Sequence, residues 1–363
     1  MVVDVSKKHA AAIFIAVLVV IATVMYIVEE DPLLIHPELR AVEKPKLDLD
    51  RLPRMVLAFY YPWYGTPWGQ TGAWRHWDEG GHDPDVFIAG RRDLGATDYP
   101  VDGPYDSKDR STIVRHFKLA EEAGIDGFIV SWWGFGTFEN QVFRLMLDVA
   151  EEVGTSVKLT IYYETVSGGR DETAEEVERI LGEYGGREAF LKVQGRPVVF
   201  IYSRAVSQMS FRDWDYVLRK VRHDGFDALF IADGFDERAA EVFDGLHMYN
   251  PVGVLSRGGN LTDLYVDAKK LAEEYGVLFA ATVLPGYDDT HVRQPGLAYP
   301  RDGGETYRKT WEAALLSHAD WVLICSWNEW HEGSEIEPSV EYGDLYIRLT
   351  AEYANSFKAG ERR

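Results

Sequence analysis

Two glutamates, a histidine and an asparagine lie close together near the C-terminus, in the segment Ser326–Gly333, whose sequence is SWNEWHEG. The apolar run 321–325 directly before it predicts a buried strand, so these polar groups stand where that strand ends. Carboxylates can transfer protons or attack a carbon atom. Indole faces, which two tryptophans supply here, stack on sugar rings. The combination indicates cleavage of a glycosidic bond.

The two glutamates of this segment, Glu329 and Glu332, stand three positions apart. On a helical turn such side chains are neighbours, with Cβ atoms about 5–6 Å apart. That separation resembles the roughly 5–5.5 Å between the carboxyl groups of retaining glycosidases. Two carboxylates on one short loop cannot easily stand on opposite sides of a sugar ring, however. The spacing therefore favours a mechanism in which the substrate itself supplies the nucleophile.

The elements that must position these residues follow one another regularly from residue 54 to residue 363. Apolar runs alternate there with amphipathic helical stretches, which is typical of parallel strands joined by crossover helices. The eight candidate strands are 55–61, 127–133, 158–163, 197–202, 228–233, 245–249, 278–283 and 321–327. Eight such units predict an α/β fold, a (β/α)8 TIM barrel. An open doubly wound sheet is the alternative, but no glycine-rich phosphate loop follows the first run.

Aromatic, amide and carboxylate residues gather at the C-terminal ends of the candidate strands, where barrel enzymes build their sites. A sugar site needs flat apolar faces and fixed polar groups. The residues that we expect to line it lie at or just beyond the ends of the runs: Tyr60, Tyr61 and Trp63 at the first, Trp132 at the second, Glu164 at the third, Tyr202 at the fourth, Tyr249 at the sixth, and Asn328 and His331 at the eighth. Each aromatic could instead pack in the core. For Glu164 a functional role is favoured, because burying an unpaired carboxylate at the end of an apolar strand costs free energy.

The composition limits which partners are expected. A net charge of −21 disfavours nucleic acid through long-range repulsion. The single cysteine, Cys325, rules out an intramolecular disulfide and a cysteine-based zinc site. His76 and His82 match no tight ligand spacing, and His331-Glu332 lacks the second histidine of a zinc helix. We therefore predict neither a metal nor another cofactor.

The N-terminus predicts a membrane anchor over residues 1–28. Basic residues precede a charge-free run from Ala10 to Val28, and three acidic residues follow it. A helix of that length spans about 28 Å, and the charge asymmetry favours a catalytic domain outside the cytoplasm. A cleaved signal peptide, which would give a secreted protein, is the alternative. Residues 29–53 are charged and rich in proline, and predict a linker.

Four segments resemble glycoside hydrolase family 99, the family of endo-α-mannosidases and endo-α-mannanases. They are 60–64 (YYPWY), 74–77 (WRHW), 132–134 (WWG) and, most specifically, 328–333 (NEWHEG). The resemblance extends from residue 55 to the C-terminus. It implies a (β/α)8 barrel that cleaves inside an α-mannoside chain, with retention of configuration and without a metal.

The resemblance also implies roles for individual residues. Glu329 would be the base that deprotonates the sugar 2-hydroxyl to give a 1,2-anhydro sugar, and Glu332 the general acid and then base. Glu164 would bind the sugar at the cleavage subsite, with Tyr249 near the reacting centre. The implied substrate is an α-linked oligosaccharide or polysaccharide. Related proteins occur in polysaccharide biosynthesis, so a non-hydrolytic glycan-binding or assembly protein is the alternative, and metal-dependent hydrolysis is a third.

Overall fold

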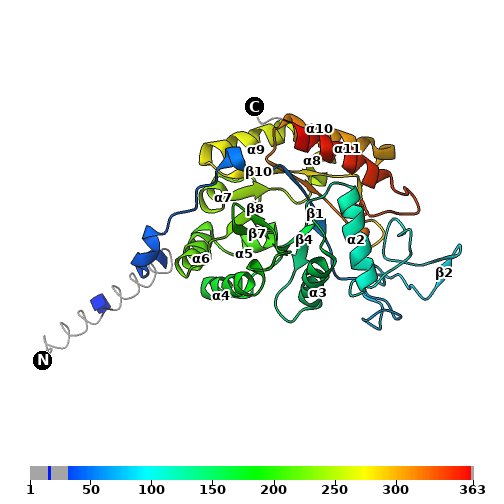
Figure 1. The fold of residues 1–363 in the computed structure, drawn as a ribbon, viewed down its shortest axis with the longest axis horizontal. Helices are drawn as coiled ribbons and strands as arrows, with labels where there is room; N and C mark the ends of the chain where they lie inside the picture. Colours follow the sequence, from blue (N-terminus) through cyan, green and yellow to red (C-terminus); the bar gives the residue numbers. More distant parts are fainter. Residues whose placement is uncertain (1–14, 18–31, 361–363) are drawn as a thin grey trace, which may run out of the picture.

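The computed structural model describes residues 15–17 and 32–360 (Figure 1). The predicted membrane anchor falls almost entirely outside these residues. Within them, no helix is both long and apolar enough to cross a membrane.

Eight parallel strands close into a barrel, as the alternation of apolar runs and helical stretches predicts. Neighbouring strands pair all the way round, from β1 with β13 to β5 with β7, so the eight barrel strands form a closed ring. The barrel strands are β1 (Met55–Tyr60), β4 (Gly127–Trp132), β5 (Lys158–Tyr163), β7 (Arg196–Ile201), β8 (Leu229–Asp233), β9 (Gly245–His247), β10 (Leu278–Val283) and β13 (Trp321–Ile324). This closure confirms the (β/α)8 barrel and removes the open-sheet alternative.

Helices surround the barrel, and local sequence signals explain where several of them begin and end (Figure 1). The Thr137 hydroxyl accepts from the Asn140 N–H at the start of α3, and Gly154 closes that helix with φ 67°. The larger helices are α2 (Arg110–Glu122), α3 (Phe138–Val153), α4 (Arg170–Ile180), α6 (Phe211–His223), α9 (Leu261–Tyr275), α10 (Glu305–Leu316) and α11 (Leu345–Ala359), and α5 (Ser203–Gln208), α7 (Glu237–Val242) and α8 (Val252–Leu255) are short.

The strands are apolar on both faces, because one face fills the barrel and the other meets the helices. Along β1, Phe59 belongs to the core cluster inside the barrel, together with Tyr61 just beyond the strand. Ala58 and Tyr60 alternate with them and belong to the cluster beneath the helices. This alternation decides which strand-end residues can reach the barrel mouth.

The segment predicted as a linker lies on the barrel wall. Residues 32–53 form three short 3-10 turns, η1 (Pro32–Leu34), η2 (Pro37–Ala41) and η3 (Leu49–Arg51). Leu39 is buried at 2% exposure, and Lys44 Nζ donates to the Ala240 carbonyl at 2.8 Å, at α7. Residues 32–53 are therefore docked on the barrel, because apolar and charged side chains hold them against α6 and α7.

The long connection between β1 and α2 covers the barrel mouth, as its length predicts. It carries one small hairpin, β2 (Phe87–Ile88) with β3 (Arg91–Arg92), which projects from the molecule in Figure 1. Trp77 of this connection is fully buried and donates to the Tyr105 carbonyl at 2.9 Å. The Thr97 N–H donates to the Trp330 carbonyl, so the connection is bonded to the segment that holds both motif glutamates.

Candidate active site

A cavity of about 200 Å³ opens where the barrel strands end, and both motif glutamates line it. Its walls come from seven different strand ends and from the β1–α2 connection. The lining residues are Tyr61, Trp63, His76, Glu79, Trp133, Tyr162, Glu164, Tyr202, Arg204, Tyr249, Arg293, Glu329, His331 and Glu332. Eight of the eleven residues predicted from the sequence are among them.

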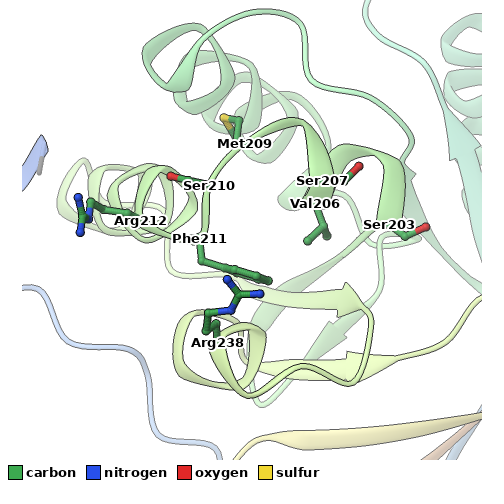
Figure 2. Close-up of a pocket in the computed structure, with 8 residues that line it drawn as sticks. All are labelled: Ser203, Val206, Ser207, Met209, Ser210, Phe211, Arg212 and Arg238. Carbon is green, nitrogen blue, oxygen red and sulfur yellow. The ribbon is translucent and has the colours of Figure 1, made fainter. Parts of the chain in front are cut away.

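A larger hollow of about 720 Å³ lies between α5, α6 and α7 (Figure 2). Serines, Met209 and Phe211 line it, and Arg238 stands over the Phe211 ring at 4.9 Å. The described residues that line it include no carboxylate and no imidazole. It lacks the acid and base that glycoside cleavage needs, so the smaller cavity is the candidate active site.

Glu329 is buried and lacks a hydrogen-bond donor on one oxygen. Its backbone N–H donates to Ser326 Oγ at 2.8 Å, just before the 3-10 turn η6 (Trp330–Glu332). Its Oε1 atom has no hydrogen-bond partner among the described residues, and the residue is 3% exposed. Burial, and then the charge of Glu332, raise the pKa of Glu329 well above its usual value. Oε1 is therefore available to accept a hydrogen bond from a substrate hydroxyl.

Glu332, in contrast, has two donors. Arg293 Nη1 donates to Oε1 at 3.0 Å, and the Tyr249 hydroxyl lies 3.2 Å from Oε2. Burial raises the pKa of Glu332, while Arg293 opposes that rise. The Tyr61 hydroxyl donates to the Tyr249 hydroxyl at 2.6 Å and completes the chain of bonds. The charge of Glu332 is one cause of the raised pKa of Glu329, so the ionisation of the two buried carboxyl groups is linked.

Glu164 stands on the opposite wall at the end of β5. The Ser131 hydroxyl donates to its Oε1 at 2.7 Å, and Trp133 Nε1 donates to that same Ser131 oxygen at 3.0 Å. Burial raises the pKa of Glu164 to about 7. A carboxyl group in a cavity with a pKa close to neutral pH is typical of a functional site.

We expect Glu164→Gln to stabilise the protein increasingly as the pH rises from 5 to 8. The folded state holds the Glu164 proton up to about pH 7, whereas the unfolded state loses it near the ordinary glutamate pKa of 4.5. Folding therefore binds a proton in this window, and the stability of the wild type falls as the pH rises through it. The free energy of unfolding of Glu164→Gln minus that of the wild type should therefore grow by on the order of 3 kcal/mol between pH 5 and pH 8. Urea unfolding at both pH values measures it, and an unchanged difference would contradict the raised pKa.

The aromatic wall of the cavity consists of stacked rings. Trp63 stacks on the His76 ring, with centroids 4.6 Å apart and planes at 13°. Across the cavity, the Arg204 guanidinium lies over Trp133 at 4.7 Å and over Tyr202 at 5.5 Å. These arrangements hold flat faces in place, as sugar stacking requires.

Three predicted site residues lie outside the cavity. Tyr60 and Trp132 are fully buried beneath the helices, where Tyr60 bonds His116 at 3.0 Å and Trp132 Nε1 donates to Asn140 at 2.9 Å. The side chains of Tyr60 and Trp132 point from β1 and β4 toward the surrounding helices. Trp133, the next residue after Trp132, lines the cavity instead. Asn328 is buried behind the motif, where its amide accepts from the Tyr61 N–H at 2.7 Å and donates to the Tyr61 carbonyl at 2.9 Å. It ties the motif to β1 and does not face the cavity.

The sequence prediction missed several lining residues. Tyr162 and Arg204 each stand two positions from a predicted residue, Glu164 and Tyr202, and strand periodicity could have found Tyr162. Glu79 lies in the irregular β1–α2 connection, where no periodicity indicates which side chains turn inward.

A closed barrel with a pair of buried carboxylates among aromatic rings at its mouth is typical of a glycoside hydrolase, and the comparisons agree. The model of glycosyl hydrolase family 99 matches residues 51–350. Glycoprotein endo-alpha-1,2-mannosidase of Mus musculus is 28% identical, over 86% of this chain and 77% of that protein. The GH99 endo-alpha-mannosidase structure from Bacteroides thetaiotaomicron has a TM-score of 0.71 at 28% identity, covering 86% of this chain and 98% of that one.

The family match spans most of the barrel and both motif glutamates. The chain therefore belongs to glycosyl hydrolase family 99 and is an endo-acting glycoside hydrolase.

Proposed function

We propose that this protein is a retaining endo-α-mannosidase that cleaves internal bonds of an α-mannoside glycan or polysaccharide. The observation that carries the proposal is the position of Glu329 and Glu332 on one short turn of a cavity lined with aromatic rings. The choice of a mannoside as substrate rests on the names of the similar proteins. The cavity residues provide the acid, the base and the aromatic faces on which a sugar can stack.

The chemistry that this site supports uses the substrate's own 2-hydroxyl. Glu329 Oε1, the buried atom without a donor, takes the hydroxyl proton while O2 attacks C1. Glu332 protonates the departing glycosidic oxygen, which gives a 1,2-anhydro sugar. Water then opens that ring as the two carboxyl groups return to their starting states, and the two inversions at C1 leave the configuration retained.

For the first step Glu332 must carry a proton and Glu329 must be ionised. In the free protein two side chains donate to Glu332, whereas Oε1 of Glu329 has no donor among the described residues, which favours the proton on Glu329. A bound 2-hydroxyl would give Glu329 its missing donor and so allow it to ionise. We therefore expect substrate binding to move the proton to Glu332.

Product analysis with a panel of linear α-mannans tests the proposal. Oligosaccharides released from the wild type, with little free mannose, would support endo cleavage of mannosides. Tight binding without any product would instead favour a non-hydrolytic glycan-binding protein. A 2-deoxy sugar at the cleaved position removes the proposed nucleophile, so it should be bound but not cut, and its cleavage at a normal rate would contradict the mechanism.

We also propose that the charge-free run 10–28 anchors the protein in a membrane, with the barrel outside the cytoplasm. The length of the run and the basic-to-acidic order of its flanks support this. An anchored protein stays with membranes through an alkaline wash, and externally added protease digests its barrel. A soluble protein whose N-terminus lies beyond the run would indicate a cleaved signal peptide.

A further inference from the structure

His76, Glu79 and His331 bring three metal-ligand groups together at the edge of the cavity. One ligand atom from each lies within 4.8 Å of the others. His76 Nδ1 is 2.8 Å from Glu79 Oε1, and His331 Nδ1 is 3.8 Å from Glu79 Oε2. The mechanism proposed above gives none of the three a role, so their convergence needs another explanation.

The hydrogen bond of His331 fixes which of its nitrogens is free. Its Nε2 atom bonds the His76 carbonyl, which can only accept, so Nε2 carries the proton. Nδ1 of the neutral ring therefore presents a lone pair toward Glu79 and toward Glu329 Oε1, which lies 4.0 Å away. Metal-binding histidines are commonly held in this way, with the other ring nitrogen donating to a carbonyl or carboxylate.

Several possible metal-ligand atoms converge here. His331 Nδ1 and carboxylate oxygens of Glu79 and Glu329 face one another, and the Glu329 oxygen has no hydrogen-bond partner within the described part of the chain. His76 Nδ1 is likewise buried, and it lies 2.8 Å from Glu79 Oε1. A cation would compensate the Glu79 charge and bind the lone pair of His331 Nδ1, and it would take the place of any proton on His76 Nδ1.

The position of His76 is also unusual. Its backbone has φ 61°, a left-handed conformation that is uncommon for a residue other than glycine. Stacking on Trp63 holds its ring in place. Strained residues persist mainly where the surrounding structure over-determines them, often at binding sites.

We propose that His76, Glu79 and His331 form a binding site for one divalent transition-metal ion of the zinc class. Two imidazoles and one or two carboxylates suit Zn²⁺ and Co²⁺ rather than Mg²⁺ or Ca²⁺. The ion would also draw on the free oxygen of Glu329 and thereby block the base. This inhibitory consequence rests on the proposed function, whereas the metal site itself does not.

A Co²⁺ titration of the full-length protein, purified without a histidine tag and followed by visible absorption, tests the site. We expect saturation at one Co²⁺ per chain and displacement by Zn²⁺. Glu79→Gln removes a ligand on a half-exposed side chain, and His76→Asn keeps a residue type that tolerates positive φ. Each should weaken binding by more than the roughly 10–100-fold typical of losing an outer-shell partner.

The control is His291→Asn, which alters a second histidine pair, His82 and His291, with ring centroids 6.1 Å apart. Its Co²⁺ affinity should equal that of the wild type. Absence of a saturable signal, unchanged affinity in Glu79→Gln, or loss of binding in His291→Asn would overturn the site. A protein that binds Co²⁺ but cleaves no mannoside would refute only the proposed function. One that cleaves mannosides but binds no Co²⁺ would refute only the site.

Discussion

Glu332→Gln is expected to lower kcat on an unactivated α-mannoside by at least about 100-fold, because the departing oxygen loses its proton donor. The same variant should recover much of its activity on a mannosyl fluoride or a dinitrophenyl mannoside, whose leaving groups need no proton. Glu329→Gln should be inactive on both kinds of substrate, because neither supplies a base for the 2-hydroxyl. Initial rates of the purified variants on the two substrates measure the difference.

The control for this comparison is Glu341→Gln. Glu341 pairs with Arg91 outside the cavity, so its loss should leave both rates unchanged. Rescue of Glu329→Gln rather than Glu332→Gln would show that the two roles are reversed. That outcome has a physical basis in the free protein, where Arg293 and Tyr249 both favour an ionised Glu332.

Arg301→Met is expected to reduce the free energy of unfolding by about 3–5 kcal/mol, the typical result of removing one partner from a buried ion pair. Arg301 lies between Asp98, at 3.3 Å, and Glu335, and is 7% exposed. Its guanidinium also donates to the Glu335 carbonyl at 2.9 Å and to the Gly333 carbonyl at 3.2 Å. The variant therefore loses both the buried charge balance and the support behind the catalytic turn.

The pH dependence of this loss gives a second measurement. Burial raises the pKa of Asp98 and of Glu335, and Arg301 opposes the rise in both. Without the arginine, the folded state holds these protons to a higher pH than the unfolded state does, so its stability falls as the pH rises. The deficit of Arg301→Met should therefore be larger at pH 8 than at pH 5. Arg308→Met is the matched control, because its partly exposed pair with Glu305 contributes about 0–1 kcal/mol.

The barrel could be predicted from the sequence because eight apolar runs alternate with helical stretches. The ends of the runs were less certain. The run 245–249 shortens to β9, Gly245–His247, because the Tyr249 N–H donates to Asp233 at 3.0 Å instead of joining a strand ladder. Proline and charge in residues 32–53 gave no sign of docking, because only the three-dimensional surface of α6 and α7 offers Leu39 and Lys44 their partners.

The site was predictable where chemistry and position coincide, as for Glu329, Glu332 and Glu164, which are costly to bury unless used. For the adjacent aromatic residues, the sequence does not indicate which one faces the cavity. Both faces of a barrel strand are apolar, so Trp132 and Trp133 fit either face equally well. Asn328 shows a third case. Its amide suits a sugar hydroxyl, yet it bonds the backbone of Tyr61, a contact between residues 267 positions apart.

The measurement that tests the central claim most directly is ¹H NMR of the anomeric region during the first minutes of cleavage of a linear α-mannan. The account predicts that the first new reducing ends are α-anomers of oligosaccharides, with the β-anomer growing in later by mutarotation. Initial β-anomers would show inversion, which the paired glutamates on one turn do not explain. Initial release of free mannose would show exo cleavage and would contradict an internal site of attack.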